Sequence, residues 1–209
     1  MDSRDSVTPT VISETPPWLV VAKPAGWLTI PGRDNSSVLQ AWVQSHFGKV
    51  WVVHRLDRDT SGVLLFARTA QAHRLANTWF QKHEVKKIYE CLAHGIPAMP
   101  VFKIQRAVSS MPSITQVEVL KSCSIGFLAQ VRPITGRRHQ IRIHLSKEGF
   151  PLWGDAEYGG KTEIQFGSNI LKINRVALHA RSLELPSGDR FEAPWPDDFK
   201  GWVEELRRA

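Results

Sequence analysis

The chain has 209 residues, 42% of them hydrophobic, which is enough for the core of one domain or a compact pair. Its formal net charge of +7 favours a polyanionic partner such as nucleic acid, although a basic protein without such a partner has the same balance. Two cysteines argue against a disulfide framework and fit a cytoplasmic protein. Membrane attachment is not expected, because the chain has no long apolar run and its polar N-terminus is not a signal peptide.

The first half of the chain begins with a segment rich in Ser, Thr, Pro and charge, residues 1–16, which predicts a flexible tail before a single domain over residues 17–209. The apolar spacing then predicts, in order, a strand over 18–22, a helix over 38–47, strands over 50–53 and 63–67, a helix over 70–82 and a strand over 86–93. Ser36 or Ser37 is expected to cap the first helix, and Thr69 the second.

The second half begins with residues 95–114, which contain three prolines and are expected to be mostly irregular. Strands over 116–122 and 127–132, a helix over 137–148, a Gly-rich loop over 153–169, an extended stretch over 175–185 and a helix over 197–207 follow. Strands outnumber helices, and their connections are of mixed type. We therefore expect an α+β fold with a mixed, mainly antiparallel central sheet flanked by helices and loops.

The strongest chemical signal is the charged loop expected between residues 53 and 63. Asp57 lies between Arg55 and Arg58, and nearby positive charge keeps a carboxylate ionised. Such a carboxylate is available as a nucleophile or a base. A salt bridge that merely holds a surface loop accounts for the same residues.

A second basic cluster, R-P-I-T-G-R-R-H-Q-I-R-I-H, occupies residues 132–144. On the expected helix Arg138 and Arg142 share one face at i,i+4, and their mutual repulsion indicates a polyanion or a buried carboxylate partner. Arg142 is expected to point inward beside Ile141, and Asp57 is one available carboxylate. A solvated basic face is the alternative.

Several other types of site are not indicated. The sequence lacks a phosphate-binding Gly-rich loop, a serine nucleophile elbow and any metal-ligand spacing of Cys and His. Neither a nucleotide cofactor nor a metal is therefore expected. Tyr89, in the strand expected over 86–93, is either a sheet-face tyrosine or a base-stacking residue.

The motif H-R-L-D-R-D-T-S-G-V-L-L-F-A, residues 54–67, resembles the central motif of the RluA-type pseudouridine synthases. The resemblance extends to V-V-A-K-P-A-G-W-L, K-K-I-Y-E-C-L-A-H-G, R-P-I-T-G-R-R-H-Q-I-R-I-H, G-D-A-E-Y-G-G and R-V-A-L-H-A-R-S-L-E-L. It covers roughly residues 17 to 200, which makes chance a poor explanation.

The resemblance implies an enzyme that detaches uracil from its ribose in RNA, turns the base and rejoins it through carbon five. Asp57 falls on the family's catalytic aspartate, Tyr89 on a tyrosine that stacks on the base and helps remove the carbon-five proton, and Arg142 on the arginine that pairs with the aspartate. Arg55 falls on an arginine that fills the space left by a flipped base. The same motifs supply the further expected RNA contacts, which are Lys23, His54, Arg138 and His139.

The resemblance also implies the pseudouridine synthase fold, no metal or organic cofactor, and ribosomal or transfer RNA as the partner. A monomer is the default expectation for a small RNA-modifying domain. Many members carry an N-terminal S4 RNA-binding domain, whereas only about sixteen residues precede the first motif here. RNA selection is therefore expected to rest on the catalytic domain. The stretch S-S-M-P-S-I-T, residues 109–115, lacks the basic pattern expected there, which leaves the choice of RNA open.

Two other functions fit parts of the pattern. A non-catalytic RNA-binding or ribosome-assembly module with the same fold would use the basic charge and Arg55, but would not need an intact aspartate. A glycosidase-like hydrolase would need two separated carboxylates, whereas Asp59 lies in the same tight loop as Asp57. The co-occurrence of Asp57, Tyr89 and Arg142, each in its own motif, favours the synthase.

Overall fold

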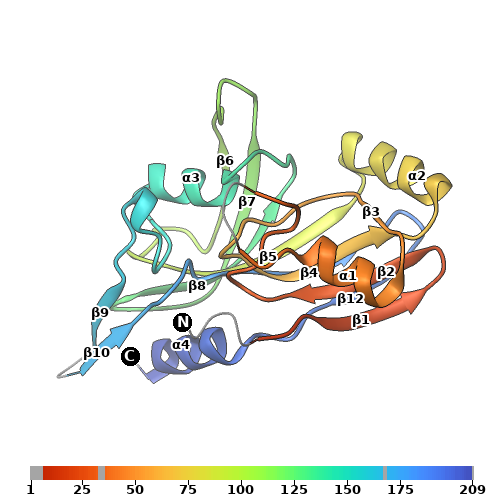
Figure 1. The fold of residues 1–209 in the computed structure, drawn as a ribbon. Helices are drawn as coiled ribbons and strands as arrows, with labels where there is room; N and C mark the ends of the chain where they lie inside the picture. Colours follow the sequence, from red (N-terminus) through yellow and green to blue (C-terminus); the bar gives the residue numbers. More distant parts are fainter. Residues whose placement is uncertain (1–6, 33–35, 167–168, 209) are drawn as a thin grey trace. The chain divides into compact units, whose positions relative to one another are not determined.

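The computed structural model describes residues 7–32, 36–166 and 169–208, and these residues form two compact units (Figure 1). Unit 1 comprises the chain up to Lys86 together with Ala180–Pro194, and unit 2 comprises Lys87–His179 and the chain from Trp195 onward. Both units combine helices with antiparallel strands, which confirms the predicted α+β class with a mixed, mainly antiparallel sheet. The single domain expected over residues 17–209 stays a prediction.

The strands of unit 1 are organised around β4 (Ser61–Ala67), in which all seven residues are buried. A strand covered on both faces has no polar alternation, and the apolar run in the sequence predicted this burial. Strands β2 and β3 pair with β4 antiparallel, and β1 pairs with β2. The other strands are β1 (Thr10–Thr15), β2 (Trp18–Lys23), β3 (Trp51–Val52), β11 (Leu178–Glu184, within unit 1 from Ala180) and β12 (Arg190–Glu192), which pairs with β11.

Strand β1 shows that the flexible tail predicted for residues 1–16 is wrong for residues 10–15. These residues pair with the buried strand β2 along their length. Composition concealed the strand, because four of its six residues are Thr, Ser or Glu and it is held by backbone pairing. Residues 1–6, which belong to the same predicted tail, lie outside the described residues.

Helix α2 (Ala70–Gln81) begins where the sequence predicted. The hydroxyl oxygen of Thr69 accepts a hydrogen bond from the Ala72 amide at 3.1 Å, so the predicted cap is confirmed. Ala72 and Ala76 are buried in the apolar core of unit 1, whereas Leu75 is exposed.

Helix α1 (Leu39–Phe47) is present, but its predicted serine cap is wrong. The cap position is Val38, which makes no side-chain capping bond. The Leu39 and Gln40 amides donate instead to the carbonyl oxygens of Leu28 and Thr29, at 2.8 and 3.2 Å. The backbone carbonyl groups of Leu28 and Thr29 therefore accept the hydrogen bonds at the start of α1, in place of the local serine cap that the sequence suggested.

Unit 2 carries an antiparallel sheet in the strand order β5, β8, β7, β6. Its strands are β5 (Lys86–Ala93, within unit 2 from Lys87), β6 (Val101–Gln105), β7 (Ile114–Cys123) and β8 (Gly126–Pro133). Strands β5, β7 and β8 were predicted. Strand β6 was not predicted and lies in the segment expected to be irregular. Its alternation of exposed and buried residues is short and is surrounded by prolines, so the sequence did not indicate a strand there.

The stretch expected as a Gly-rich loop over 153–169 contains regular structure. It holds the 3₁₀ helix η2 (Ala156–Tyr158) and β9 (Glu163–Phe166), which forms a hairpin with β10 (Asn169–Lys172). Glycines and charges dominate the sequence here, so the strand period is too short to stand out. Residues 167–168 lie outside the described residues.

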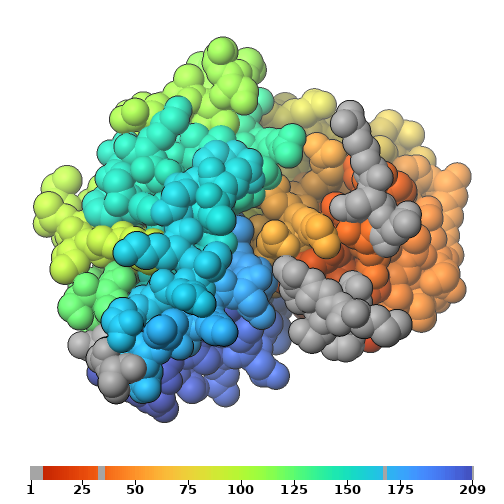
Figure 2. Space-filling model, turned by 60° about the vertical axis from the view of Figure 1, so that its left-hand side comes forward, coloured from red at the N-terminus to blue at the C-terminus, as the bar shows by residue number. Residues whose placement is uncertain are grey.

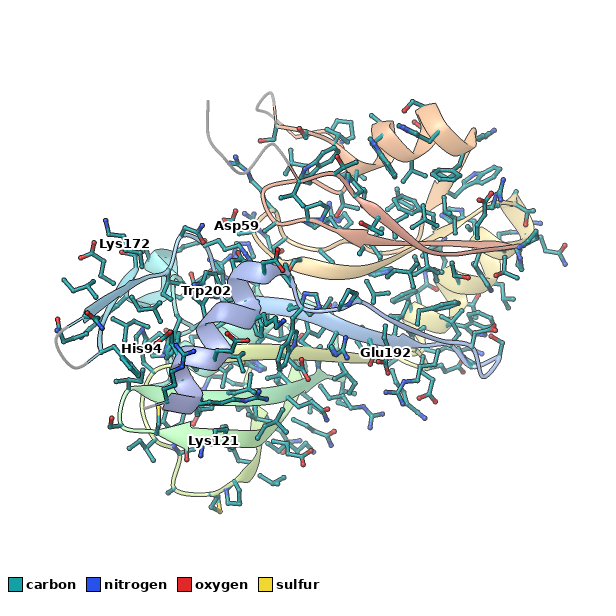
Figure 3. All side chains as sticks on the ribbon, turned by 90° about the horizontal axis from the view of Figure 1, so that it is seen from below. Asp59, His94, Lys121, Lys172, Glu192 and Trp202 are labelled. Carbon is teal, nitrogen blue, oxygen red and sulfur yellow. The ribbon has the colours of Figure 1, made fainter. Side chains whose placement is uncertain are left out.

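Two helices cover two separate apolar clusters in unit 2. Helix α3 (Gln140–Lys147) buries Ile141 and Leu145 in a cluster with Cys91, while α4 (Asp197–Arg208), which carries Trp202 in Figure 3, packs on a cluster that includes Leu92. Because successive residues of a strand point to opposite faces, Cys91 and Leu92 show that both faces of β5 are covered. The helix predicted over 197–207 is confirmed, and the buried face of α4 consists of Phe199, Trp202, Val203 and Leu206.

Candidate active site

The loop between β3 and β4, residues 53–60, carries the predicted catalytic aspartate. Asp57 is half-buried, and Arg55 and Arg58 on either side of it are exposed. The Thr60 amide donates to the backbone carbonyl oxygen of Asp57 at 3.1 Å, which closes a turn just before the buried strand β4. The charged residues are therefore presented by a turn fixed at both ends by strands.

Lys23, at the end of β2, ties the first motif to this loop. Its ammonium group donates to the carbonyl oxygens of Pro24, Trp27 and Arg58 at 2.8, 2.7 and 2.9 Å, and the residue is 1% exposed. An ammonium has three N–H donors, so these three carbonyls engage its full donor capacity. Lys23 thus positions the loop of Asp57; its predicted contact with RNA stays a prediction.

His54 holds the beginning of the loop. Its Nε2 accepts a hydrogen bond from the Leu65 amide at 3.0 Å, and its ring stacks on Phe80 with ring centres 4.9 Å apart. A nitrogen that accepts from an amide carries no proton, so the neutral ring has its proton on Nδ1. His54 is thus bonded to β4 and packed on α2; its predicted contact with RNA stays a prediction.

Tyr89 lies in β5, where it pairs with Val131 of β8. It is half-buried and packs against the apolar cluster that contains Ile141 of α3. A tyrosine at this position has its ring anchored by the core while part of its surface stays accessible. This is the arrangement that a base-stacking residue needs, and that role remains a prediction.

Lys87 lies two residues before Tyr89 and so on the same face of β5. Its ammonium donates to the Thr135 carbonyl oxygen, in the turn that precedes α3, at 3.2 Å. Burial lowers the pKa of Lys87 to about 8, because the charged form loses hydration there. No role for Lys87 was predicted from the sequence.

Arg142 forms a buried ion pair in unit 2. Its Nε and Nη2 donate to the two carboxylate oxygens of Asp155, both at 2.7 Å, and Nη2 also donates to Glu157 at 2.8 Å. Burial alone would lower the pKa of Arg142, but the two carboxylates raise it above its ordinary value. The inward orientation and the buried carboxylate partner that the sequence predicted are present; the partner within unit 2 is Asp155.

The predicted face shared by Arg138 and Arg142 is wrong, because α3 begins only at Gln140. The Gln140 amide group explains this late start. Its oxygen accepts from the Thr135 hydroxyl at 2.7 Å and from the Arg137 amide at 3.1 Å, which folds the preceding residues into a separate turn. Arg138 therefore lies outside the helix and is exposed.

His139 precedes α3 in a left-handed conformation, with φ 53°. Its Nδ1 lies 3.0 Å from the Tyr158 hydroxyl and 3.6 Å from a Glu157 carboxylate oxygen. The Tyr158 ring also lies beneath the Arg142 guanidinium, at 4.8 Å. Figures 1 and 2 show the segments of α3 and η2 side by side at the surface of unit 2.

Three residues of this cluster, Asp155, Glu157 and Tyr158, were missed as site residues. The sequence signal was present in G-D-A-E-Y-G-G, which was matched to the family without a role for its side chains. The turn of η2 brings them onto α3, and the Ser146 hydroxyl secures that turn by donating to the Tyr158 carbonyl oxygen at 2.7 Å. Spacing alone could not reveal this contact.

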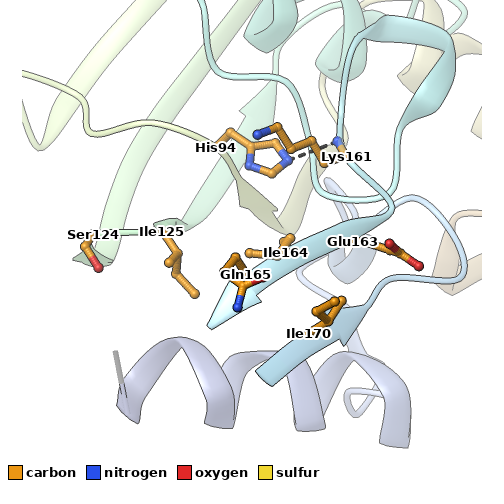
Figure 4. Close-up of a pocket in the computed structure, with 8 residues that line it drawn as sticks. All are labelled: His94, Ser124, Ile125, Lys161, Glu163, Ile164, Gln165 and Ile170. Atoms are coloured by element: carbon orange, nitrogen blue, oxygen red, sulfur yellow. Dashed lines mark hydrogen bonds between the residues drawn. The ribbon is translucent and has the colours of Figure 1, made fainter. Parts of the chain in front are cut away.

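Unit 2 also contains a cavity of about 450 Å³ beside the β9–β10 hairpin (Figure 4). In it, His94 Nε2 accepts from the Lys161 amide at 3.1 Å, and burial followed by the charge of Lys161 lowers the pKa of His94. The lining contains none of the predicted site residues; it consists of His94, Ser124, Ile125, Lys161, Glu163, Ile164, Gln165 and Ile170.

The predicted residues divide between the two units. Lys23, His54 and Asp57 belong to one bonded loop system in unit 1, whereas Tyr89 and Arg142 belong to unit 2. That Asp57, Tyr89 and Arg142 act as one constellation stays a prediction. Over residues 7–32, 36–166 and 169–208, no group of three His, Cys, Asp or Glu side chains is placed to hold a metal ion. None of the helices in the described part of the chain has the length and apolar character to cross a bilayer.

Comparison with known proteins gives a consistent result. The chain is 32% identical to a Pseudomonas aeruginosa protein named ribosomal large subunit pseudouridine synthase D, over 91% of this chain and 69% of that protein. It is 30% identical to a Salmonella typhi protein named tRNA pseudouridine synthase C, over 81% of this chain and 77% of that protein. The fold is similar to that of the solved human RNA pseudouridylate synthase domain containing 4, with a TM-score of 0.78, 22% identity and coverage of 95% and 93% of the two chains.

The family described as RNA pseudouridylate synthase matches residues 17–147. This range includes the loop of Asp57, the strand of Tyr89 and all of α3. The motifs, the fold and the relatives agree, and the chain belongs to the RNA pseudouridylate synthase family.

Proposed function

We propose that this synthase converts uridines of ribosomal or transfer RNA to pseudouridine, with Asp57 as its catalytic carboxylate. The observation that carries the proposal is the position of Asp57, half-buried in a turn that Lys23 and the Thr29 hydroxyl anchor through hydrogen bonds to its backbone. A reacting group gains most when its surroundings hold it in place before the substrate arrives. The names of the relatives point to ribosomal and transfer RNA as the two substrate classes.

The reaction exchanges one bond of uracil for another, so it needs no oxidant or reductant. The bond between N1 of uracil and C1′ of ribose breaks, the base turns, and C5 bonds to C1′. The proton leaves C5, and N1 gains one. In the proposed division of labour Asp57 supplies the nucleophile or base, Tyr89 stacks on the base and helps remove the C5 proton, and Arg142 pairs with the aspartate.

RNA binding is proposed to use Arg55, Arg138 and His139. Arg55 and Arg138 are exposed, as phosphate or base contacts must be, and Arg55 fills the space of the flipped base. We further propose that the enzyme works in the cytoplasm as a monomer and without a nucleotide cofactor.

The test is release of tritium from RNA labelled at carbon five of uridine and taken from a cell that lacks this enzyme. Wild-type protein is expected to release tritium, and Asp57→Asn to release none while it binds RNA within tenfold of wild type. Asp59→Asn is the matched control, because it removes a half-buried carboxylate from the same loop and is expected to keep turnover. Release by Asp57→Asn would exclude Asp57 as the catalytic carboxylate.

Separate ribosomal and transfer RNA fractions decide the substrate class. Release from one fraction alone names it, and mapping of the product then gives the uridine. Tight binding without release by wild-type protein from either fraction would favour a non-catalytic RNA-binding module.

A further inference from the structure

The two carboxylates on Arg142 differ sharply in their exposure to solvent. Arg142 is 7% exposed and the side chain of Asp155 is 1% exposed, whereas that of Glu157 is 56% exposed. Breaking a buried pair leaves an uncompensated buried charge, while an exposed pair is held weakly. Asp155 is therefore a permanent partner of the guanidinium, and Glu157 is one that solvent or another anion can replace.

The hydrogen bonds of Arg142 show which part of the guanidinium is available. Of its five N–H donors, one on Nε and one on Nη2 are engaged by Asp155, and the second on Nη2 is engaged by Glu157. Among the described residues of unit 2, no acceptor lies at Nη1. Both donors of Nη1 are therefore unengaged within unit 2, and the proposed pairing with Asp57 needs only one of them.

An RNA phosphate fits the remaining edge of the guanidinium. Phosphate oxygens pair with two parallel N–H groups of arginine, and the edge formed by Nη1 and Nη2 presents such a pair. Glu157 occupies the Nη2 donor of that edge, at 2.8 Å. A phosphate can engage both nitrogens only when Glu157 has left, since one donor cannot serve two anions and the anions repel each other.

The surroundings of Glu157 permit that departure. Its carboxylate is 3.6 Å from His139 Nδ1 and shares a hydrogen bond with the Tyr158 side chain, while the Tyr158 backbone is held by the Ser146 hydroxyl through its carbonyl oxygen. Although burial alone would raise the pKa of Glu157, the hydrogen bond and charge of Arg142 lower it, so the side chain is an anion. The Glu157 side chain can turn into solvent while η2 stays in place.

We propose that Glu157 occupies the phosphate-binding edge of Arg142 in the RNA-free enzyme and is displaced by a phosphate of the RNA, while Asp155 holds the guanidinium throughout. Glu157 thereby competes with the RNA phosphate for Arg142 and lowers the affinity for RNA, because its contact with Nη2 has to be broken before the phosphate binds. The inference rests on the proposed function, because it places the RNA at Arg142.

The test measures RNA binding in the Asp57→Asn background, in which turnover does not consume the substrate. Glu157→Gln keeps the size of the side chain and removes its charge, and is expected to tighten binding about tenfold, as expected for one freed charge-assisted contact. Glu118→Gln is the matched control: Glu118 is exposed on β7, and losing the same charge there is expected to change binding less than twofold. Equal gains in both variants would show a general charge effect and overturn the proposal.

Two further variants separate the possible causes. Arg142→Lys lacks the guanidinium edge, so Glu157→Gln is expected to give no gain in that background. In the alternative, the Asp57 carboxylate displaces Glu157 and no phosphate is involved. Glu157→Gln would then tighten RNA binding only in protein with Asp57 intact and not in Asp57→Asn, and this result would contradict displacement by phosphate. Binding is read independently of tritium release, so an inactive wild type overturns the proposed reaction, while an unchanged affinity of Glu157→Gln overturns this inference alone.

Discussion

The Thr29 hydroxyl binds both backbone groups of Leu56: it donates to the Leu56 carbonyl oxygen at 3.1 Å and accepts from the Leu56 amide at 3.2 Å. Thr29 is buried, and Leu56 is the residue immediately before Asp57. This one side chain therefore makes the two hydrogen bonds that a paired strand would make, and it fixes the backbone that presents the proposed catalytic carboxylate. Leaving a buried polar group without a hydrogen-bond partner lowers the free energy of unfolding, so the protein is expected to be sensitive to substitution of Thr29.

Thr29→Val replaces the hydroxyl by a methyl group of similar size and leaves the two Leu56 backbone groups without that partner. We expect a loss of about 1–3 kcal/mol in the free energy of unfolding, measured by urea denaturation, and a fall in tritium release larger than the loss of RNA binding. Thr29→Ser is the control, because it keeps the hydroxyl. A Thr29→Val enzyme with wild-type turnover would contradict the positioning role.

Gly62, at the beginning of β4, is expected to tolerate no side chain. Its φ is +122°, and a Cβ atom there would lie 2.1 Å from the Ala180 carbonyl oxygen of β11. Gly62→Ala is therefore expected to give little folded protein, measured by circular dichroism and soluble yield. Gly188→Ala is the control, since Gly188 also has a positive φ, +94°, but has no atom within 4 Å of the added Cβ; we expect it to cost only about 1 kcal/mol. Similar stabilities of the two variants would show that the close approach of Ala180 is unimportant.

Lys87 is expected to make stability depend on pH. Its pKa is lowered from 10.5 to about 8 in the folded chain, so between these values the unfolded chain binds a proton that the folded chain does not. Stability from this group therefore rises as the pH increases from 8 to 10.5. Lys87→Met should be more stable than wild type at pH 7, and the difference should shrink towards pH 10.5, as measured by urea denaturation at several pH values. A constant difference would show that Lys87 titrates normally.

RNA binding is expected to weaken steeply with salt, because the net charge of +7 and the exposed arginines favour phosphate contacts. We expect affinity, measured by filter binding, to fall at least about tenfold between 50 and 200 mM salt. Arg55→Gln and Arg138→Gln should each reduce the slope of the logarithmic plot by about one if each residue contacts a phosphate. A flat response would exclude a binding mode based on several phosphates.

The local sequence was sufficient to predict an element wherever the interactions that form it lie within one segment of the chain. The Thr69 cap of α2 and the apolar run of β4 were readable, because the first is a bond within three residues and the second is a continuous apolar stretch. Strand β1 and the start of α1 were not readable. In both cases a backbone segment elsewhere in the chain supplies the hydrogen bonds, and a partner chosen by tertiary structure leaves no mark in the local spacing.

For the candidate site, the sequence by itself determined the chemistry: the family motifs, an aspartate between arginines, and an inward-facing Arg142 that requires a buried anion. Only the tertiary structure decided which groups bind the buried charged side chains. It placed Lys23 on three carbonyl groups and paired Arg142 with Asp155, thirteen residues further along the chain, through the turn of η2. The physical reason is that burial makes an ionic partner obligatory, which the sequence reveals, whereas the identity of that partner depends on where the backbone returns.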